Sequence, residues 1–262
     1  MDMTTKNIGF IGLGKMASAI ISGLDKQTNH IFAAGRDFEK TQKSADLLGI
    51  TALSDLTDLV AKSDIIILSV KPQILPSVLT AIASNLTGKT IVSIAAGLKL
   101  ADLEDLADAA FVRVMPNINA EIQQSTSAIV RNNKVSDGNF ALVKNIFEQC
   151  GTVHEIAEKD FSNFTALAGS SPAYIYMFID ALSRAGVLHG LPKDVSTKIV
   201  AETVAASAQM VLNSDDSPMN LVDKVCSPAG TTIAGVNSLE QNKFTGTVME
   251  AITATIEKEK RL

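Results

Sequence analysis

Residues 8–20, IGFIGLGKMASAI, are the feature that most restricts the possible folds of this chain. An apolar run ends at two glycines, and the residues that follow have helical character. Gly12 permits a tight turn, and Gly14 lets backbone N–H groups approach a pyrophosphate at the positive end of the helix. Ala17 replaces a third glycine and still allows close helix packing. Because the pattern ends a first strand and opens a βαβ unit, it predicts a dinucleotide site rather than a simple strand-to-helix turn.

Short apolar runs alternate with helical stretches through the first half of the chain. Five of them predict strands, at residues 7–14, 30–35, 64–70, 90–97 and 110–117, and two more at 126–132 and 152–157 are candidates for the far edge. Continuous apolar runs with helices between them favour a parallel sheet covered on both faces.

From Asp160 onward the pattern becomes helical and rich in alanine. Helices are predicted over residues 174–190, 191–214, 217–226 and 244–261. Their apolar residues occupy more than one face, which favours burial against a partner chain. The predicted fold class is therefore α/β, with an N-terminal Rossmann-type doubly wound sheet (1–159) followed by an all-helical C-terminal dimerisation domain (160–262).

Composition excludes several classes of function. The 262 residues carry a net charge of −5 without basic runs, which argues against nucleic acid or anionic membrane as the main partner. Cys150 and Cys226 lie far apart, so neither a disulfide framework nor a metal site is predicted, and a cytoplasmic location is expected. The first apolar run, residues 8–13, is too short for a signal or a membrane span.

The second predicted strand ends in AAGRD (33–37), which bears on the choice of cofactor. Arg36 is a planar cation suited to the 2′-phosphate of NADP, and Lys40 lies one helical turn further on. Asp37 is the competing candidate, because an acidic residue at this place binds the ribose hydroxyls of NAD. We expect NADPH as the cofactor, with NADH as the other possibility.

Three later strands end in small or proline-containing segments, SVKPQ (69–73), AAG (95–97) and MPN (115–117). Carboxyl ends of parallel strands share one edge of a sheet, so these segments predict a floor for the nicotinamide. For Lys71 we expect the backbone to make the contact. The predicted cofactor-binding residues are Gly12, Gly14, Lys15, Met16, Ala17, Arg36, Ser69, Val70, Lys71, Pro72, Ala95, Ala96, Gly97 and Asn117.

The segment KVCSPAGTTIAGVNSLE (224–240) contains a hydroxyl-rich loop with no histidine and no metal-ligand pair. Successive N–H groups of a glycine-containing loop can bind a carboxylate. The alternative is a simple helix N-cap, in which Ser or Thr caps a helix that begins near Thr231. The two interpretations are compatible, because a helix N-terminus also binds anions.

Over essentially its whole length the chain resembles the pyrroline-5-carboxylate reductase family. The resemblance rests on GFIGLGKMASAI, SVKPQ, SIAAG, RVMPN, TALAGSSPAYIYMFIDAL and, most specifically, VCSPAGTTIAGVNSLE. The chain departs from the usual family pattern at three places: Ser171 and Ala229 stand where glycine is usual, and Ile118-Asn119 where Thr-Pro is usual.

This resemblance implies the reduction of 1-pyrroline-5-carboxylate, a cyclic imine carrying a carboxylate, to L-proline by NAD(P)H, the last step of proline biosynthesis. It implies that Ser227, Gly230, Thr231 and Thr232 bind the substrate and that the Thr232 hydroxyl orients the ring nitrogen. It also implies a homodimer or a larger homo-oligomer.

Two other functions remain open at the level of sequence. The N-terminal motif also suits β-hydroxyacid dehydrogenases, but these carry a lysine a few residues beyond a GSS-like segment, and residues 169–180 contain none. The chain could alternatively be a non-catalytic NADP-binding module, against which the complete SPAGTT loop argues.

Overall fold

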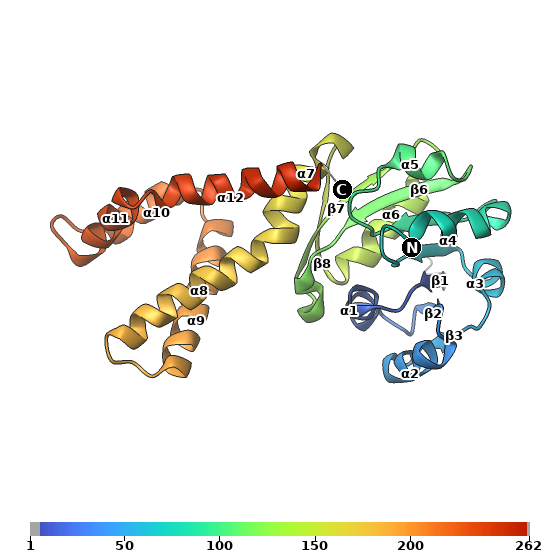
Figure 1. The fold of residues 1–262 in the computed structure, drawn as a ribbon, viewed down its shortest axis with the longest axis horizontal. Helices are drawn as coiled ribbons and strands as arrows, with labels where there is room; N and C mark the ends of the chain where they lie inside the picture. Colours follow the sequence, from blue (N-terminus) through green and yellow to red (C-terminus); the bar gives the residue numbers. More distant parts are fainter. Residues whose placement is uncertain (1–5, 261–262) are drawn as a thin grey trace. The chain divides into compact units, whose positions relative to one another are not determined.

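The structure is a computed structural model that describes residues 6–260, and it divides into two compact units (Figure 1). The first extends to Gly169 and includes the chain end from Glu259, and the second comprises Ser170–Lys258. The domain division at 159/160 stays a prediction.

The first unit is built on an eight-stranded sheet with the order β3-β2-β1-β4-β5-β6-β7-β8. The strands are β1 (Lys6–Ile11), β2 (Asn29–Ala34), β3 (Thr51–Ala52), β4 (Ile65–Leu68), β5 (Thr90–Ser93), β6 (Ala110–Met115), β7 (Ser125–Arg131) and β8 (Gly151–Glu155). The first six pair in parallel in the order 3-2-1-4-5-6, which confirms the Rossmann-type fold. β7 runs antiparallel to β6, and β8 is parallel to β7.

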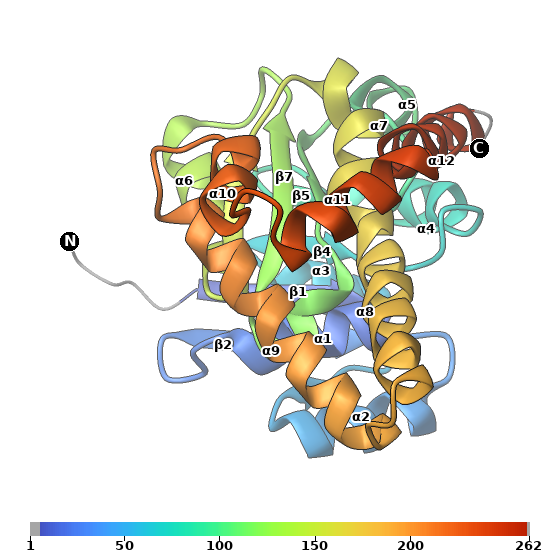
Figure 2. The same cartoon turned by 90° about the vertical axis from the view of Figure 1, so that its left-hand side faces the viewer.

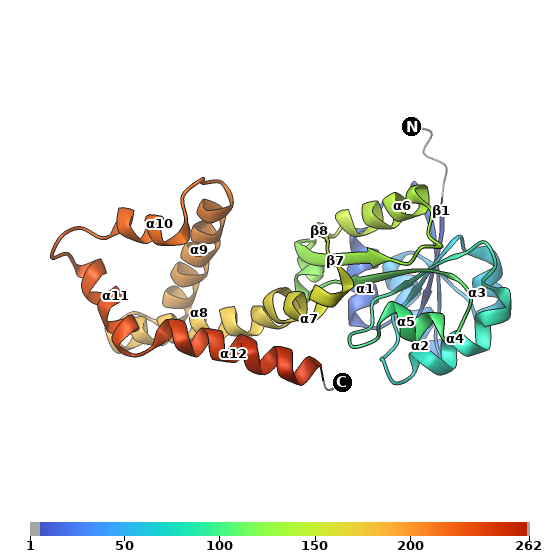
Figure 3. The same ribbon diagram turned by 90° about the horizontal axis from the view of Figure 1, so that it is seen from above.

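Helices cover both faces of this sheet (Figure 3). α1 (Lys15–Gly23) and α6 (Asp137–Glu148) contribute to the apolar core of one face. α3 (Leu56–Lys62), α4 (Leu75–Ile82) and α5 (Leu100–Glu104) contribute to the core of the other. Every residue of β4 is buried, as a strand covered on both faces requires, and this explains its unbroken apolar sequence.

The remaining elements of the first unit are short connections and one edge helix. They are α2 (Phe38–Leu48), the 3₁₀ helices Ala83–Asn85, Ile118–Ile122 and Glu158–Asp160, the single turn α7 (Phe161–Phe164) and the π-helix Thr165–Ser170. The last three lead the chain into the helical unit.

The second unit consists of helices, which are coloured yellow to red in Figure 2. They are α8 (Ser171–Leu188), α9 (Lys193–Leu212), α10 (Pro218–Val225), α11 (Thr231–Gln241) and α12 (Phe244–Glu259). α8 and α9 approach closely at Gly186, where an added Cβ would lie 2.0 Å from the Ser196 Oγ. Across residues 170–258, all of which the structure describes, the only buried residues are Ser183 and Ser196. This unit therefore has no apolar core of its own.

Candidate active site

The glycine turn after β1 is held by the strand beside it. Gly12 has a φ of +93°, and an added Cβ would lie 2.9 Å from the Val70 Cγ1, so only glycine fits without strain. The Ser69 Oγ donates to the Gly12 carbonyl at 2.5 Å and to the Ile11 carbonyl at 3.1 Å. The glycine turn and the segment SVKPQ, which are both predicted to bind the cofactor, thus lie side by side.

The N-terminus of α1 is open to a ligand. Gly14 is its N-cap, no side chain caps the helix, and its first turn contains no acidic residue. Apart from Gly14 itself and its two neighbours in the chain, no described residue comes within 4 Å of the place where a Gly14 Cβ would stand. Gly14, Lys15 and Lys40 line one open hollow. Free N–H groups, the positive end of the helix dipole and two lysines fit the phosphates of a dinucleotide.

Asp37 is used by the protein itself. Its carboxylate caps α2, with the Oδ1 accepting the Lys40 N–H at 3.0 Å. From sequence, Asp37 was the competing candidate for the ribose hydroxyls, and its capping role was not predicted, although an Asp directly before a helical stretch is the usual signal for a helix cap. Arg36 is exposed and forms no ion pair with any residue in the range 6–260. The geometry therefore leaves Arg36 available to a phosphate.

The exits of β4, β5 and β6 lie at the same edge as the glycine turn, because these strands are parallel to β1 and neighbours of one another. Lys71 is exposed, and its carbonyl accepts from the N–H groups of Ile74 and Leu75 at 2.9 and 3.1 Å. Pro72 opens a turn, and α4 begins three residues later at Leu75.

After β5, Ala95 is buried, Ala96 is half-buried, and Gly97 adopts a φ of +82°. Asn117, after β6, is also buried, and its amide is occupied by the fold. Its Nδ2 donates to the Ala168 carbonyl at 3.0 Å, and its Oδ1 accepts the Asn119 N–H at 3.1 Å. The role of Asn117 toward a cofactor stays a prediction, whereas its role in holding this edge together is visible.

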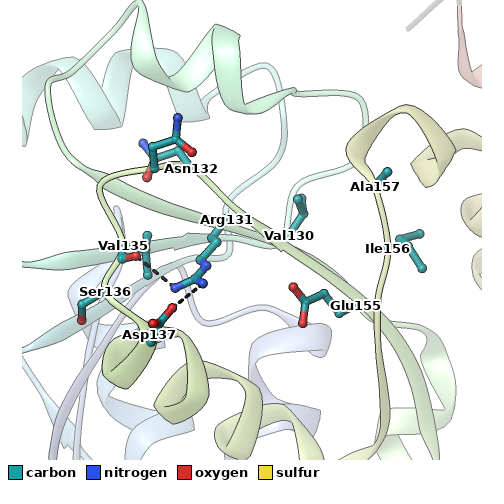
Figure 4. A pocket seen from close by; sticks show the side chains of 10 residues that line it. Val130, Arg131, Asn132, Val135, Ser136, Asp137, Glu155, Ile156 and Ala157 are labelled. Carbon is teal, nitrogen blue, oxygen red and sulfur yellow. Dashed lines mark hydrogen bonds and ion pairs between the residues drawn. The ribbon is translucent and has the colours of Figure 1, made fainter.

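A second hollow, of about 880 Å³, lies at the opposite edge of the sheet (Figure 4). It is lined by the ends of β7 and β8, and since β7 is antiparallel to β6, these ends lie where the parallel strands begin. Its guanidinium, that of Arg131, is paired with Asp137 at 2.5 Å and donates to the Val135 carbonyl at 3.1 Å. This edge is the wrong one for a dinucleotide, because ligands of such sheets bind at the carboxyl ends of the strands.

In the helical unit, the loop before α11 gathers the predicted substrate residues. The Gly230 N–H donates to the Ser227 carbonyl at 3.0 Å, and a Cβ at Gly230 would lie 2.3 Å from the Ser227 Oγ. The Ser227 hydroxyl is thus folded over the start of α11, and the absence of a side chain at Gly230 makes this possible. Gly230 provides space rather than a donor, since its own N–H is occupied.

Thr231 and Thr232 form the first turn of α11, and both are exposed. No side chain caps this helix, so the first N–H groups of the turn point to solvent beside the Ser227 hydroxyl. Ala229 adopts a φ of +56°, a conformation that favours glycine. The loop can donate several hydrogen bonds to one small anion.

Lys224 is the cation nearest to this loop in sequence, and it is paired with Asp216. Its hydrogen bond is the first cause that holds the pKa of the Asp216 carboxyl below its ordinary value, followed by that of the Ser214 hydroxyl. Backbone N–H groups and hydroxyls are therefore the donors that the loop offers to an anion.

Two features bear on a metal ion and a membrane. Residues 6–260 contain no group of three His, Cys, Asp or Glu side chains arranged to hold a metal ion. None of the helices formed by these residues is both long and apolar enough to cross a bilayer.

Comparison with known proteins matches both parts of the chain. Residues 158–262 match the family model for pyrroline-5-carboxylate reductase dimerisation, and residues 7–97 match that for NADP oxidoreductase, coenzyme F420-dependent. The pyrroline-5-carboxylate reductase of Pisum sativum is 38% identical over 261 residues, which cover 97% of this chain and 95% of the relative.

Two solved structures agree with this comparison. The 1-pyrroline-5-carboxylate reductase of Streptococcus pyogenes has a TM-score of 0.92 and 43% identity, covering 99% of this chain and 100% of that one. The pyrroline carboxylate reductase of Plasmodium falciparum, solved with NADP bound, has a TM-score of 0.87 and 36% identity, covering 98% and 97%.

Proposed function

Because this chain belongs to the pyrroline-5-carboxylate reductase family, we propose that it reduces 1-pyrroline-5-carboxylate to L-proline with NADPH as the reductant. The observation that carries the proposal is the loop Ser227–Thr232, which lies at the uncapped start of α11 with both threonines exposed. This loop occurs in a chain that matches its relatives over almost their whole length.

The first unit supplies the residues that hold the cofactor. NADPH, when bound, supplies the hydride that reduces the imine carbon. Gly12 and Gly14 bring backbone N–H groups at the start of α1 to the pyrophosphate. Arg36 pairs with the 2′-phosphate, and Lys40, which lines the hollow beside Gly14, adds a second positive charge. The segments 69–72 and 95–97 form the floor on which the nicotinamide lies.

The second unit supplies the residues that hold the imine. The N–H groups of Thr231 and Thr232 and the Ser227 hydroxyl donate to the substrate carboxylate. The Thr232 hydroxyl accepts or donates a hydrogen bond at the ring nitrogen and fixes its orientation. A cyclic imine is readily protonated in water, so the site needs no strong general acid. Correct placement of two reactants supplies up to ~7–11 kcal/mol, which makes the absence of a catalytic histidine understandable.

The direct test is to mix the purified protein with 1-pyrroline-5-carboxylate and NADPH and to follow the consumption of NADPH and the formation of proline. Thr232→Ala removes one hydroxyl and keeps the backbone of α11. A hydrogen bond to a charged group is worth roughly 1.5–3 kcal/mol, so we expect turnover to fall about ten- to a hundredfold with unchanged NADPH affinity.

Thr231→Ala is the matched control, because Thr231 contributes its N–H and not its hydroxyl. It should retain most of the activity. An unchanged kcat and an unchanged KM for the imine in Thr232→Ala would show that the Thr232 hydroxyl has no part in the reaction.

The same assay separates the two other functions. A β-hydroxyacid dehydrogenase would reduce NADP⁺ with a β-hydroxyacid and would leave the imine untouched. A non-catalytic binding module would bind NADPH in a titration and consume neither substrate.

We further propose that the protein is a cytoplasmic homodimer. The match of residues 158–262 to a dimerisation model and the many exposed apolar side chains of α8–α12 support the dimer. Cys150 and Cys226 are free thiols, which fits a reducing compartment. Burial raises the pKa of the Cys150 thiol to about 11, so that this cysteine is an inert packing residue.

A further inference from the structure

Arg113 is a buried arginine in the middle of β6, and its charge is balanced from a distant part of the chain. Its side chain is 5% exposed, and its Nη1 lies 3.2 Å from the Glu158 Oε1. The guanidinium also stacks on the Phe161 ring, 4.4 Å from the centroid. Burying a charge is costly unless it is paired, so this arrangement is maintained against a desolvation penalty.

Glu158 holds a second group with the same oxygen. The Leu100 N–H, at the first residue of α5, donates to the Glu158 Oε1 at 2.7 Å. Residues 94–99 therefore form a loop that is fixed at both ends. At one end, Ser93 on β5 lies opposite Arg113 on β6 in the sheet. At the other end, the Leu100 N–H donates to the Glu158 carboxylate, which also pairs with Arg113. Within this loop lie Ala95, Ala96 and Gly97, the predicted floor of the nicotinamide.

Glu158 also begins the segment that connects the sheet to the helices, residues 158–169. This segment is attached to β6 and its exit at a second point, where the Asn117 Nδ2 donates to the Ala168 carbonyl at 3.0 Å. Directly after the second point, Gly169 approaches Met115, whose Cε would lie 3.4 Å from an added Cβ. The Arg113–Glu158 pair thus holds both the connecting segment and the loop 94–99.

We propose that Arg113 and Glu158 are positioning residues, which hold the loop 94–99 against the connecting segment. Their pairing keeps the residues of this loop that are predicted to contact the nicotinamide in the position that hydride transfer requires. Neither residue touches the reacting atoms. The inference rests on the proposed function, because a floor for the nicotinamide is needed only where a dinucleotide reacts.

The same sheet contains a matched control at its opposite edge. Arg131, on the neighbouring strand β7, pairs with Asp137 at 2.5 Å (Figure 4). Its guanidinium also stacks on Phe140, 4.6 Å from the ring centroid. The two trios consist of an arginine, a carboxylate and a phenylalanine. They differ in burial, since the Arg131 and Asp137 side chains are 30% and 95% exposed against 5% and 26% for Arg113 and Glu158, and in place, since the Arg131 trio lies at the edge away from the predicted cofactor contacts.

The experiment compares two double variants of the full-length enzyme. Arg113→Met/Glu158→Leu removes both charges together, so no unpaired charge stays buried and the fold is retained. We expect kcat with the imine and NADPH to fall about ten- to a hundredfold, since a displacement of about 1 Å costs this much. KM for NADPH should change little, because the phosphate contacts lie elsewhere. Arg131→Met/Asp137→Asn should keep the kcat of the wild type.

Amide hydrogen exchange, measured with and without NADPH, gives a readout that does not depend on turnover. In Arg113→Met/Glu158→Leu the Leu100 amide should exchange at least tenfold faster, and NADPH should no longer slow exchange across residues 94–99. Glu158→Gln keeps an oxygen for both donors but leaves the buried Arg113 charge without a counter-charge, so its kcat should lie between those of Arg113→Met/Glu158→Leu and the wild type.

A wild-type kcat in Arg113→Met/Glu158→Leu, or an equal loss in the Arg131 control, would overturn the proposal. If the wild-type protein itself does not reduce the imine, the proposed function fails, and the exchange of residues 94–100 with and without NADPH still decides whether the pair positions this loop.

Discussion

The sheet-containing unit and the helical unit place their apolar side chains in opposite ways. In the first, Phe111 and Phe147 are fully buried between the sheet and its covering helices. In the second, Leu188 is 80% exposed and Met177 is 71% exposed, and across residues 170–258 no apolar side chain is buried. Both units have well-formed helices, so secondary structure alone does not distinguish them.

This difference shows that the first unit has a core that can stabilise it alone, whereas the second has apolar faces that need another surface to cover them. Helices with apolar residues on several faces are stable when those faces are buried. A second copy of the chain would provide such a surface, in keeping with the dimerisation model that the segment matches. The proposed dimer would thus complete a core to which each helical unit contributes its apolar faces.

The largest expected effect tests the first half of this comparison. Phe111→Ala empties a fully buried site in β6 and should lower the free energy of unfolding by about 3–5 kcal/mol. The loss should be the same at low and high protein concentration, because this core lies within one chain. Urea unfolding followed by circular dichroism measures it. The control Leu47→Ala, at a position 89% exposed on α2, should change stability by less than about 0.5 kcal/mol.

The second prediction concerns how each unit recognises its ligand. The first offers a charged side chain, Arg36, whereas the loop before α11 offers N–H groups and hydroxyls. Arg36→Ala should raise the KM for NADPH about ten- to a hundredfold, as the loss of roughly 1.5–3 kcal/mol implies, and leave the KM for NADH and for the imine unchanged.

Lys43→Ala, which removes an exposed cation on α2, the helix that follows Arg36, is the control for a general loss of positive charge. Steady-state kinetics with both dinucleotides checks the prediction. Equal effects of Arg36→Ala on NADPH and NADH would contradict the assignment of Arg36 to the 2′-phosphate.

The third prediction tests the second half of the comparison. If the exposed faces of α8–α12 are covered by a second chain, the apparent stability of the helical unit should rise by about 1.4 kcal/mol for each tenfold increase in protein concentration. Unfolding measured at several concentrations, together with sedimentation, gives this slope. A folded, active monomer at micromolar concentration would show that the helical unit needs no partner.

Much of the fold could be predicted from sequence because short runs of apolar and polar residues determine which segments form strands and helices. β4 is covered on both faces, so its apolar run is unbroken and predicts a buried strand. β3 has only two residues, Thr51 and Ala52, which is too short to leave a pattern. The antiparallel direction of β7 was not predicted either, because strand direction depends on the path of the chain and not on the side chains of the strand.

The site divides in the same way. Gly12, Gly14 and the loop before α11 are recognised from contiguous residues, and the structure gives them the open helix N-termini that binding requires. The pairing of Arg113 with Glu158 joins residues far apart in the chain, so no local pattern reveals it. Long-range pairs of this kind become visible only when the topology brings β6 beside the connecting segment.

The smallest expected effect concerns the backbone of the substrate loop. Ala229 has a φ of +56°, which disfavours every residue with a Cβ, and the usual residue of the family at this place is glycine. Ala229→Gly should remove this strain and, after the greater entropy of unfolded glycine is subtracted, stabilise the helical unit by up to about 1 kcal/mol. Ala234→Gly, within α11, is the matched control and should destabilise the same helix by about 1 kcal/mol. Thermal unfolding of both variants at one protein concentration measures the difference.

Because the N–H groups of Thr231 and Thr232 belong to the helix and not to the turn, the KM for the imine should stay unchanged in Ala229→Gly. A loss of stability in Ala229→Gly would mean that Ala229 is held by packing against another surface, and the exposed faces of the partner chain would then be the first place to look for it.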